Sequence, residues 1–152
     1  MFCLSRCCCK IAVDSSSKVE RIVGAAVSRR LRRGFDASDR SIVISSDTLP
    51  SDNLIRLAEG ADVLVHEVLY VSAIDRLAAR VPNAATLKRS ILSHHTPAEE
   101  AGRVARAAGV KKLVLSHFVP ADDPAVTDQM WLEAARVHFR GEVILGKDLL
   151  EI

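Results

Sequence analysis

Short apolar runs alternate with amphipathic stretches from residue 41 to the end of the chain. Four runs of branched aliphatic residues predict strands, at residues 41–45, 63–65, 113–115 and 143–145. Between them, apolar residues recur at helical spacing, which predicts helices at residues 52–59, 74–80, 84–92, 97–108 and 124–139. The tail at 149–152 is a candidate fifth strand, on an edge. Strands that alternate with helices predict an α/β fold in which neighbouring strands run parallel.

Residues 93–117 carry the clearest local signals. Thr96 is a good N-cap, Pro97 suits the first helical position, and Glu99 completes a capping box. Gly109 is a plausible stop for this helix. The strand that follows delivers His117 at its C-terminal end, which is where open α/β sheets bind ligands.

The first 40 residues differ from the rest. They carry nine Lys/Arg against four Asp/Glu, whereas residues 41–152 carry twelve against fifteen. Helical spacing predicts a basic amphipathic helix over 17–33. We therefore divide the chain into a basic, Cys- and Arg-rich leader at 1–34, poorly ordered or helical, and a domain at 35–152. A solvated leader, a transit peptide, an anionic-membrane contact and a nucleic-acid contact remain open for the first part.

Composition places the chain among ordinary globular proteins, with 49% hydrophobic and 26% charged residues. No run approaches the roughly 18 apolar residues of a membrane span. All four cysteines lie within the first nine residues, too close together to staple a fold. Their placement favours a reducing compartment, and we predict a cytoplasmic location.

Ionisable residues follow three of the predicted strands: Asp47, the pair His66 and Glu67, and His117. The C-terminal ends of parallel strands meet at one rim of a sheet, and His95 can approach the same rim from its loop. Carboxylates and imidazoles bind zinc and carry protons. Each residue alone also has an ordinary structural role. In particular, a turn suits Asp47 and the protein core suits His66.

Two further histidines fit structural roles better. His94 is expected to be a loop residue, because adjacent side chains rarely aim at one target. His138, late in a helix, is expected to lie near the negative end of the helix dipole.

The order of these motifs resembles the C-terminal half of the metallo-β-lactamase fold, nearest to the tRNA 3′-processing endonuclease RNase Z and its arylsulfatase-like relatives. The resemblance extends from about Phe35 to the C-terminus. The motifs that carry it are Ser46-Asp47-Thr48, Asp62-Val63-Leu64-Val65-His66-Glu67, His95-Thr96 and Leu113-Val114-Leu115-Ser116-His117-Phe118. It implies an α/β fold that forms one half of an αββα sandwich, with helices on one face of the sheet.

The resemblance also implies a role for each site residue. Asp47 matches the aspartate that bridges two metal ions, and His117 matches a histidine ligand of the second ion. His95 matches the histidine that assists proton transfer at the scissile phosphate, and Glu67 the glutamate that orients it. The implied function is a metal-dependent hydrolase of phosphodiester or other ester bonds, with two zinc ions in an intact member and an RNA or small-molecule ester substrate.

One part of the family pattern is missing, because the chain contains no His-x-His-x-Asp-His motif. Whether this chain is itself an enzyme is therefore open, and we expect a truncated, inactive form that cannot hold two zinc ions alone. The alternative is a non-catalytic half-domain that binds a partner through an uncovered apolar sheet face. A homodimer, the leader of this chain or a complementing N-terminal half would cover that face. A third hypothesis is nucleic-acid binding by the arginine-rich leader.

Overall fold

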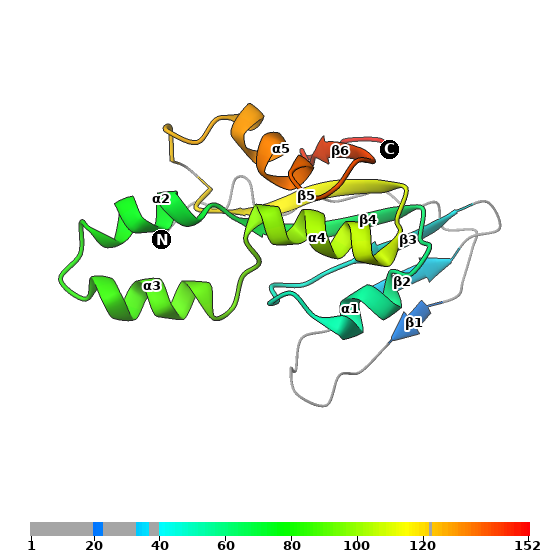
Figure 1. Ribbon diagram of the computed structural model, residues 1–152, viewed down its shortest axis with the longest axis horizontal. Helices are drawn as coiled ribbons and strands as arrows, with labels where there is room; N and C mark the ends of the chain where they lie inside the picture. Colours follow the sequence, from blue (N-terminus) through cyan, green and yellow to red (C-terminus); the bar gives the residue numbers. More distant parts are fainter. Residues whose placement is uncertain (1–19, 23–32, 37–39, 122) are drawn as a thin grey trace.

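The computed structural model describes residues 20–22, 33–36, 40–121 and 123–152 (Figure 1). Six strands form one sheet in which their spatial order equals their order in the sequence. They are β1 (Glu20–Ile22), β2 (Arg33–Asp36), β3 (Ser41–Ile44), β4 (Val63–Leu69), β5 (Lys112–Val119) and β6 (Glu142–Leu145). The first three strands pair antiparallel, whereas β3 to β6 are parallel, as the α/β prediction requires.

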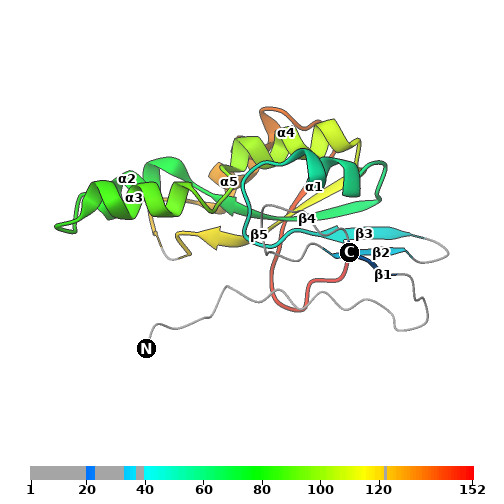
Figure 2. The same cartoon turned by 90° about the horizontal axis from the view of Figure 1, so that it is seen from below.

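Three helices cover one face of this sheet, and two others form a hairpin beyond its edge. The helices are α1 (Asp52–Leu57), α2 (Val71–Ala78), α3 (Ala84–Leu92), α4 (Ala98–Ala108) and α5 (Asp128–Arg136). Figure 2 shows α1, α4 and α5 on the same side of the strands, and Figure 1 shows α2 and α3 extending away from them. Within the described residues, no helix has both the length and the apolar character needed to cross a membrane.

Alternation along the parallel strands creates an apolar layer on each face. Leu64, Leu113 and Leu115 are fully buried on the helix-covered face, where they join the core that includes Val104 of α4 and Trp131 of α5. The other face carries Ile42, Val63, Val65 and Val114, with Ile44, Ile144 and Ile152 packed against them. Those four core side chains are each 6% exposed or less. The expectation of an uncovered apolar patch is therefore wrong at these positions.

The helix predicted over 17–33 is wrong at Glu20–Ile22, which form β1 and pair with β2. Edge pairing to an existing sheet here overrides the helical spacing of the apolar residues. Most of the leader, including its four cysteines, lies outside the described residues. The proposed domain boundary between residues 34 and 35 falls inside β2.

The C-terminal helix and tail also differ from their predicted bounds. Helix α5 begins four residues after Pro124, because the Thr127 side chain accepts a hydrogen bond from the Met130 amide and caps the helix there. The tail is not a strand, since Leu149 has a positive φ of 63° and the Leu150 amide donates to the Lys147 carbonyl. The predicted end of α4 is confirmed, because Gly109 follows the helix with a φ of 66°.

Asp62 joins the N-terminal ends of three strands. One carboxylate oxygen lies 2.6 Å from Lys111 Nζ, beside the start of β5. The other accepts a hydrogen bond from the Ser41 amide of β3 at 2.7 Å. The contact with Lys111, followed by that with the Ser41 amide, lowers the pKa of Asp62 from 3.8 to about 2. These contacts add to the ladders that pair β3, β4 and β5, whose opposite ends carry the candidate site.

We predict that Asp62→Asn lowers stability at neutral pH and weakens its acid dependence. The folded-state pKa lies below the ordinary value of 3.8, so the carboxylate stabilises the fold above about pH 4 and ceases to do so as the pH falls toward 2. Urea unfolding midpoints at several pH values measure this. The control is Asp148→Asn, at an exposed carboxylate on the C-terminal tail. Equal acid dependence in the Asp62→Asn variant and the wild type would contradict the prediction.

Candidate metal centre

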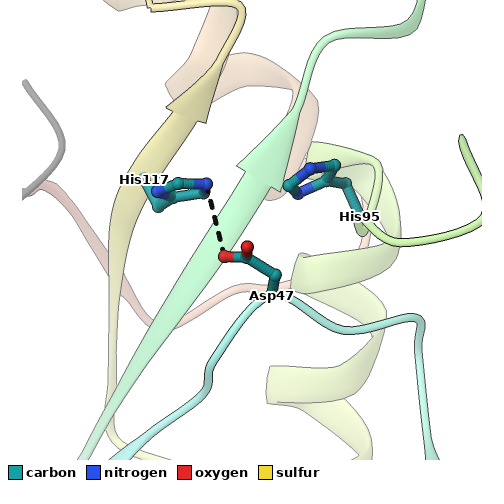
Figure 3. Close-up of side chains that lie close together, drawn as sticks. All are labelled: Asp47, His95 and His117. Carbon is teal, nitrogen blue, oxygen red and sulfur yellow. Dashed lines mark ion pairs between the residues drawn. The ribbon is translucent and has the colours of Figure 1, made fainter. Parts of the chain in front are cut away.

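Three side chains from distant segments meet at the C-terminal edge of the parallel strands. Asp47 follows β3, His95 precedes α4, and His117 lies in β5 (Figure 3). One potential ligand atom from each residue lies within 4.8 Å of those of the other two, and all three residues are half-buried. His117 Nε2 is 3.3 Å from Asp47 Oδ1. The rings of His95 and His117 stack with an interplanar angle of 21°.

A bulge in β5 presents His117 to this edge. Glu67 of β4 pairs with Ser116 and Val68 pairs with Phe118, so His117 is an extra residue in the ladder. Its φ of 46° is left-handed, a conformation that costs a residue other than glycine roughly 1 kcal/mol. Sequence reasoning placed His117 at the end of its strand, whereas β5 continues to Val119. The bulge, rather than the strand end, directs the side chain.

Glu67 lies directly behind His95. The Glu67 side chain is 2% exposed, and its Oε2 is 3.1 Å from His95 Nδ1. Its other oxygen, Oε1, accepts hydrogen bonds from the amides of Thr96 at 2.6 Å and Thr48 at 3.3 Å. A proton on Nδ1 of His95 donates to Glu67, which leaves Nε2 as the ring atom available to a metal ion or a substrate.

Thr48 and Thr96 complete this network, and sequence reasoning missed both of them. Thr96 is fully buried, and its hydroxyl donates to the Thr48 carbonyl at 2.5 Å. The predicted capping box is wrong for this reason: α4 begins at Ala98, with Pro97 at the N-cap and no side-chain cap. A threonine before a helix suits either role, and nothing local in the sequence distinguishes them.

The other histidines lie outside the three-residue cluster. His66 is fully buried, with Nδ1 2.7 Å from the Glu67 carbonyl oxygen. His94 is exposed, and its Nδ1 is 2.7 Å from the Ser90 carbonyl oxygen. His138 Nε2 lies 3.1 Å from a guanidinium nitrogen of Arg103, on the surface.

The cluster fits a divalent metal ion in both donor chemistry and spacing. One carboxylate and two imidazoles are ligands that zinc accepts. With ligand bonds of about 2.1 Å, two ligand atoms of a tetrahedral zinc ion lie about 3.4 Å apart. The distance of 3.3 Å between Asp47 Oδ1 and His117 Nε2 matches that spacing without rearrangement.

A hollow of about 640 Å³ lies between the C-terminal part of β5, helix α5 and the residues that follow β6. It is lined by Phe118, Trp131 and Lys147 among others, and by none of the three cluster residues. The cluster is therefore separate from this hollow.

The known proteins similar to this chain include sequences named ribonuclease Z and solved structures with the metallo-β-lactamase fold. Ribonuclease Z of Mycobacterium tuberculosis strain H37Rv is 35% identical over 115 residues, which cover 76% of this chain and 40% of that protein. Ribonuclease Z of Brevibacillus brevis is 44% identical over 72 residues, or 40% of this chain and 23% of that protein. No family model matches the chain.

Two solved structures agree with these relatives in fold. The metallo-β-lactamase fold protein YhfI from Bacillus subtilis superposes with a TM-score of 0.56 at 23% identity, over 77% of this chain and 41% of that one. A long form RNase Z from yeast superposes with a TM-score of 0.51 at 19% identity, over 89% of this chain and 17% of that one.

The chain therefore has part of a metallo-β-lactamase fold. Within that class, its sequence is similar to those of proteins named ribonuclease Z. It spans less than half the length of the M. tuberculosis ribonuclease Z sequences that it matches.

We predict that His117→Gly is more stable than His117→Ala by about 1 kcal/mol, because glycine adopts a positive φ without strain. Urea denaturation of the two variants measures the difference. The same pair of substitutions at Ser116, whose φ is not positive, provides the control and is expected to show the opposite order. Equal stability of the two His117 variants would show that the bulge stores no strain.

Proposed function

We propose that this chain supplies part of the active site of a metal-dependent hydrolase that cleaves phosphodiester bonds in RNA. The observation that carries the proposal is the convergence of Asp47, His95 and His117 within 4.8 Å, with the Glu67 carboxylate behind His95. The relatives named ribonuclease Z support RNA rather than a small-molecule ester as the substrate.

Asp47 and His117 would hold the metal ion in this site, and their donor atoms favour zinc. A metal ion bound there would activate water and neutralise charge that develops on a phosphate oxygen. His95 would carry a proton at Nε2, because Glu67 occupies its Nδ1 and fixes the tautomer. Thr48 and Thr96 would hold Glu67 in place through their amides.

His95 could instead act as a third metal ligand, since it lies in the same cluster. A carboxylate that binds the second ring nitrogen suits a metal-bound histidine as well as a proton carrier. We favour the proton carrier because His117 Nε2 and Asp47 Oδ1 already have the spacing of two ligands on one ion. The zinc affinity of a His95→Ala variant distinguishes the two roles, because only loss of a ligand weakens zinc binding.

The chain alone would be inactive under this proposal. A catalytic zinc ion takes three protein ligands and keeps one open position, and the family's His-x-His-x-Asp-His motif does not occur in these 152 residues. The remaining ligands would come from a complementing polypeptide segment or from a second copy of the chain.

Partner binding without catalysis is the second candidate function. The apolar layer formed by Ile42, Val63, Val65 and Val114 supports it, because no described helix covers that face of the sheet (Figure 2). These side chains are at most 6% exposed, so a partner would reach them only by displacing the groups that now pack over them. Buried parallel sheets are covered on both faces, so a complementing half or a second copy would pack there. Sedimentation of the purified chain distinguishes a homodimer from a monomer.

We predict that the chain binds at most one zinc ion, and that Asp47→Asn and His117→Ala each weaken this binding by about tenfold or more. His95→Ala and Glu67→Gln are expected to retain it. Isothermal titration with zinc measures all four variants, and His138→Ala is the control outside the cluster. If His95→Ala loses zinc as strongly as His117→Ala, His95 is a ligand and not the proton carrier. Binding of two zinc ions per chain would refute the incomplete-site proposal.

Activity tests require the missing ligands. We predict no metal-dependent hydrolysis of bis(p-nitrophenyl) phosphate by the chain alone, and hydrolysis when it replaces the matching segment of M. tuberculosis ribonuclease Z. In that chimaera, His95→Ala should lower kcat by about 100-fold or more while metal content is kept. p-Nitrophenyl sulfate tests the arylsulfatase-like alternative in parallel. A chimaera that binds metal but cleaves neither compound would contradict the proposed chemistry.

A further inference from the structure

Basic side chains are concentrated on the α2–α3 hairpin, residues 71–92. This segment carries four Lys/Arg and one Asp, whereas the remaining residues between 41 and 152 carry eight Lys/Arg and fourteen Asp/Glu. The hairpin is therefore the positive part of an otherwise acidic body. Concentrated positive charge of this kind attracts polyanions.

The hairpin begins and ends at the candidate metal centre. It follows β4 directly, four residues after Glu67, and it ends at Leu92, three residues before His95. Figure 1 shows its two helices projecting beyond the sheet. With eight residues in α2, its tip lies about 12 Å from its base. A ligand held along the hairpin would therefore extend away from the cluster rather than fill it.

Two ion pairs fix the hairpin and leave two arginines for a ligand. Arg76 Nη2 is 2.8 Å from Asp123 Oδ2, and Lys88 Nζ is 2.5 Å from Asp75 Oδ1. The Ala125 amide, followed by Arg76 and then by the nearby charge of Arg80, holds the pKa of Asp123 below its usual value of 3.8. Arg80 and Arg89 are exposed and form no ion pair with any described carboxylate.

The composition of the hairpin favours a polynucleotide backbone over a membrane. Helices that lie on membranes bury a face rich in Trp, Phe or Leu. Residues 71–92 contain no aromatic residue, and their exposed large apolar side chains are Val71 and Leu77. The segment also offers no aromatic ring on which a base could stack, so its exposed charge favours contacts with phosphates.

We propose that the α2–α3 hairpin binds the phosphate backbone of an RNA substrate, with Arg80 and Arg89 as its phosphate contacts. The proposal rests on the function proposed above, because it assumes that the scissile phosphate lies at Asp47, His95 and His117. The hairpin acts in binding and not in chemistry. Such contacts position the RNA without reading its sequence.

Anisotropy of a fluorescein-labelled RNA stem-loop, measured with EDTA over a range of salt concentrations, tests this without a loaded metal site. The Arg80→Gln/Arg89→Gln variant should bind roughly tenfold more weakly, with a salt slope reduced by about 1 to 2. The matched control is Arg106→Gln/Arg136→Gln, which removes the same charge from exposed positions on α4 and α5. Both variants keep the basic leader, so their difference reports the hairpin.

Equal RNA binding by the two double variants would overturn the proposal, as would an absence of wild-type binding. Wild-type binding of a labelled poly-glutamate as tight as that of RNA would overturn it too, because the partner would then be any polyanion. Circular dichroism melting checks that both variants are folded. Metal-dependent hydrolysis by the chimaera is measured separately, so failure of the metal chemistry is distinguishable from failure of the hairpin.

Discussion

The buried carboxylate of Glu67 is the interaction on which the candidate site depends. A charge with so little exposure is costly unless its oxygens are compensated by hydrogen bonds or opposite charge. Its compensation comes from three groups: the Thr48 amide, the Thr96 amide and the ring of His95. These groups belong to two loops that are separated in the sequence by α1, β4 and the α2–α3 hairpin. One side chain therefore links the loop that carries Asp47 to the loop that carries His95.

The sheet supplies the other half of this arrangement. Parallel pairing of β3, β4 and β5 brings Asp47, Glu67 and His117 to one edge, and Asp62 fixes the same strands at their opposite ends. The bulge turns the His117 side chain toward that edge, and it does so with a left-handed backbone conformation that is strained for a histidine. Strained backbone of this kind persists only where the surrounding structure determines it, and such positions cluster at functional sites. Here the β4–β5 hydrogen bonds on both sides of the bulge hold His117 in this conformation.

The sequence predicted the parts of the structure that depend on local pattern. Branched aliphatic runs located β3 to β6, and Gly109 located the end of α4. Strand-end residues indicated which side chains would converge, because parallel connections constrain where strand ends lie. Thr96 shows where this reasoning fails. Its local pattern is that of a helix cap, but its amide and hydroxyl bond to Glu67 and Thr48, which lie 29 and 48 residues away. The bulge at His117 and the strand at Glu20–Ile22 likewise follow from pairing with another strand, which the local sequence does not encode.

The proposed RNA-binding surface is formed entirely by this chain, whereas the proposed metal site lacks some of its ligands. The hairpin is held by ion pairs between described residues, Arg76 with Asp123 and Lys88 with Asp75, so its charged surface needs no additional segment. The metal cluster contains one carboxylate and two imidazoles, and one of those imidazoles is already engaged by Glu67. A two-metal hydrolase needs more ligands than these three residues provide. Because RNA would contact the hairpin through phosphates and the metal would contact Asp47 and His117, the two properties rest on separate residues. Under the two proposals, the chain would bind RNA by itself, whereas hydrolysis would need metal ligands from another segment.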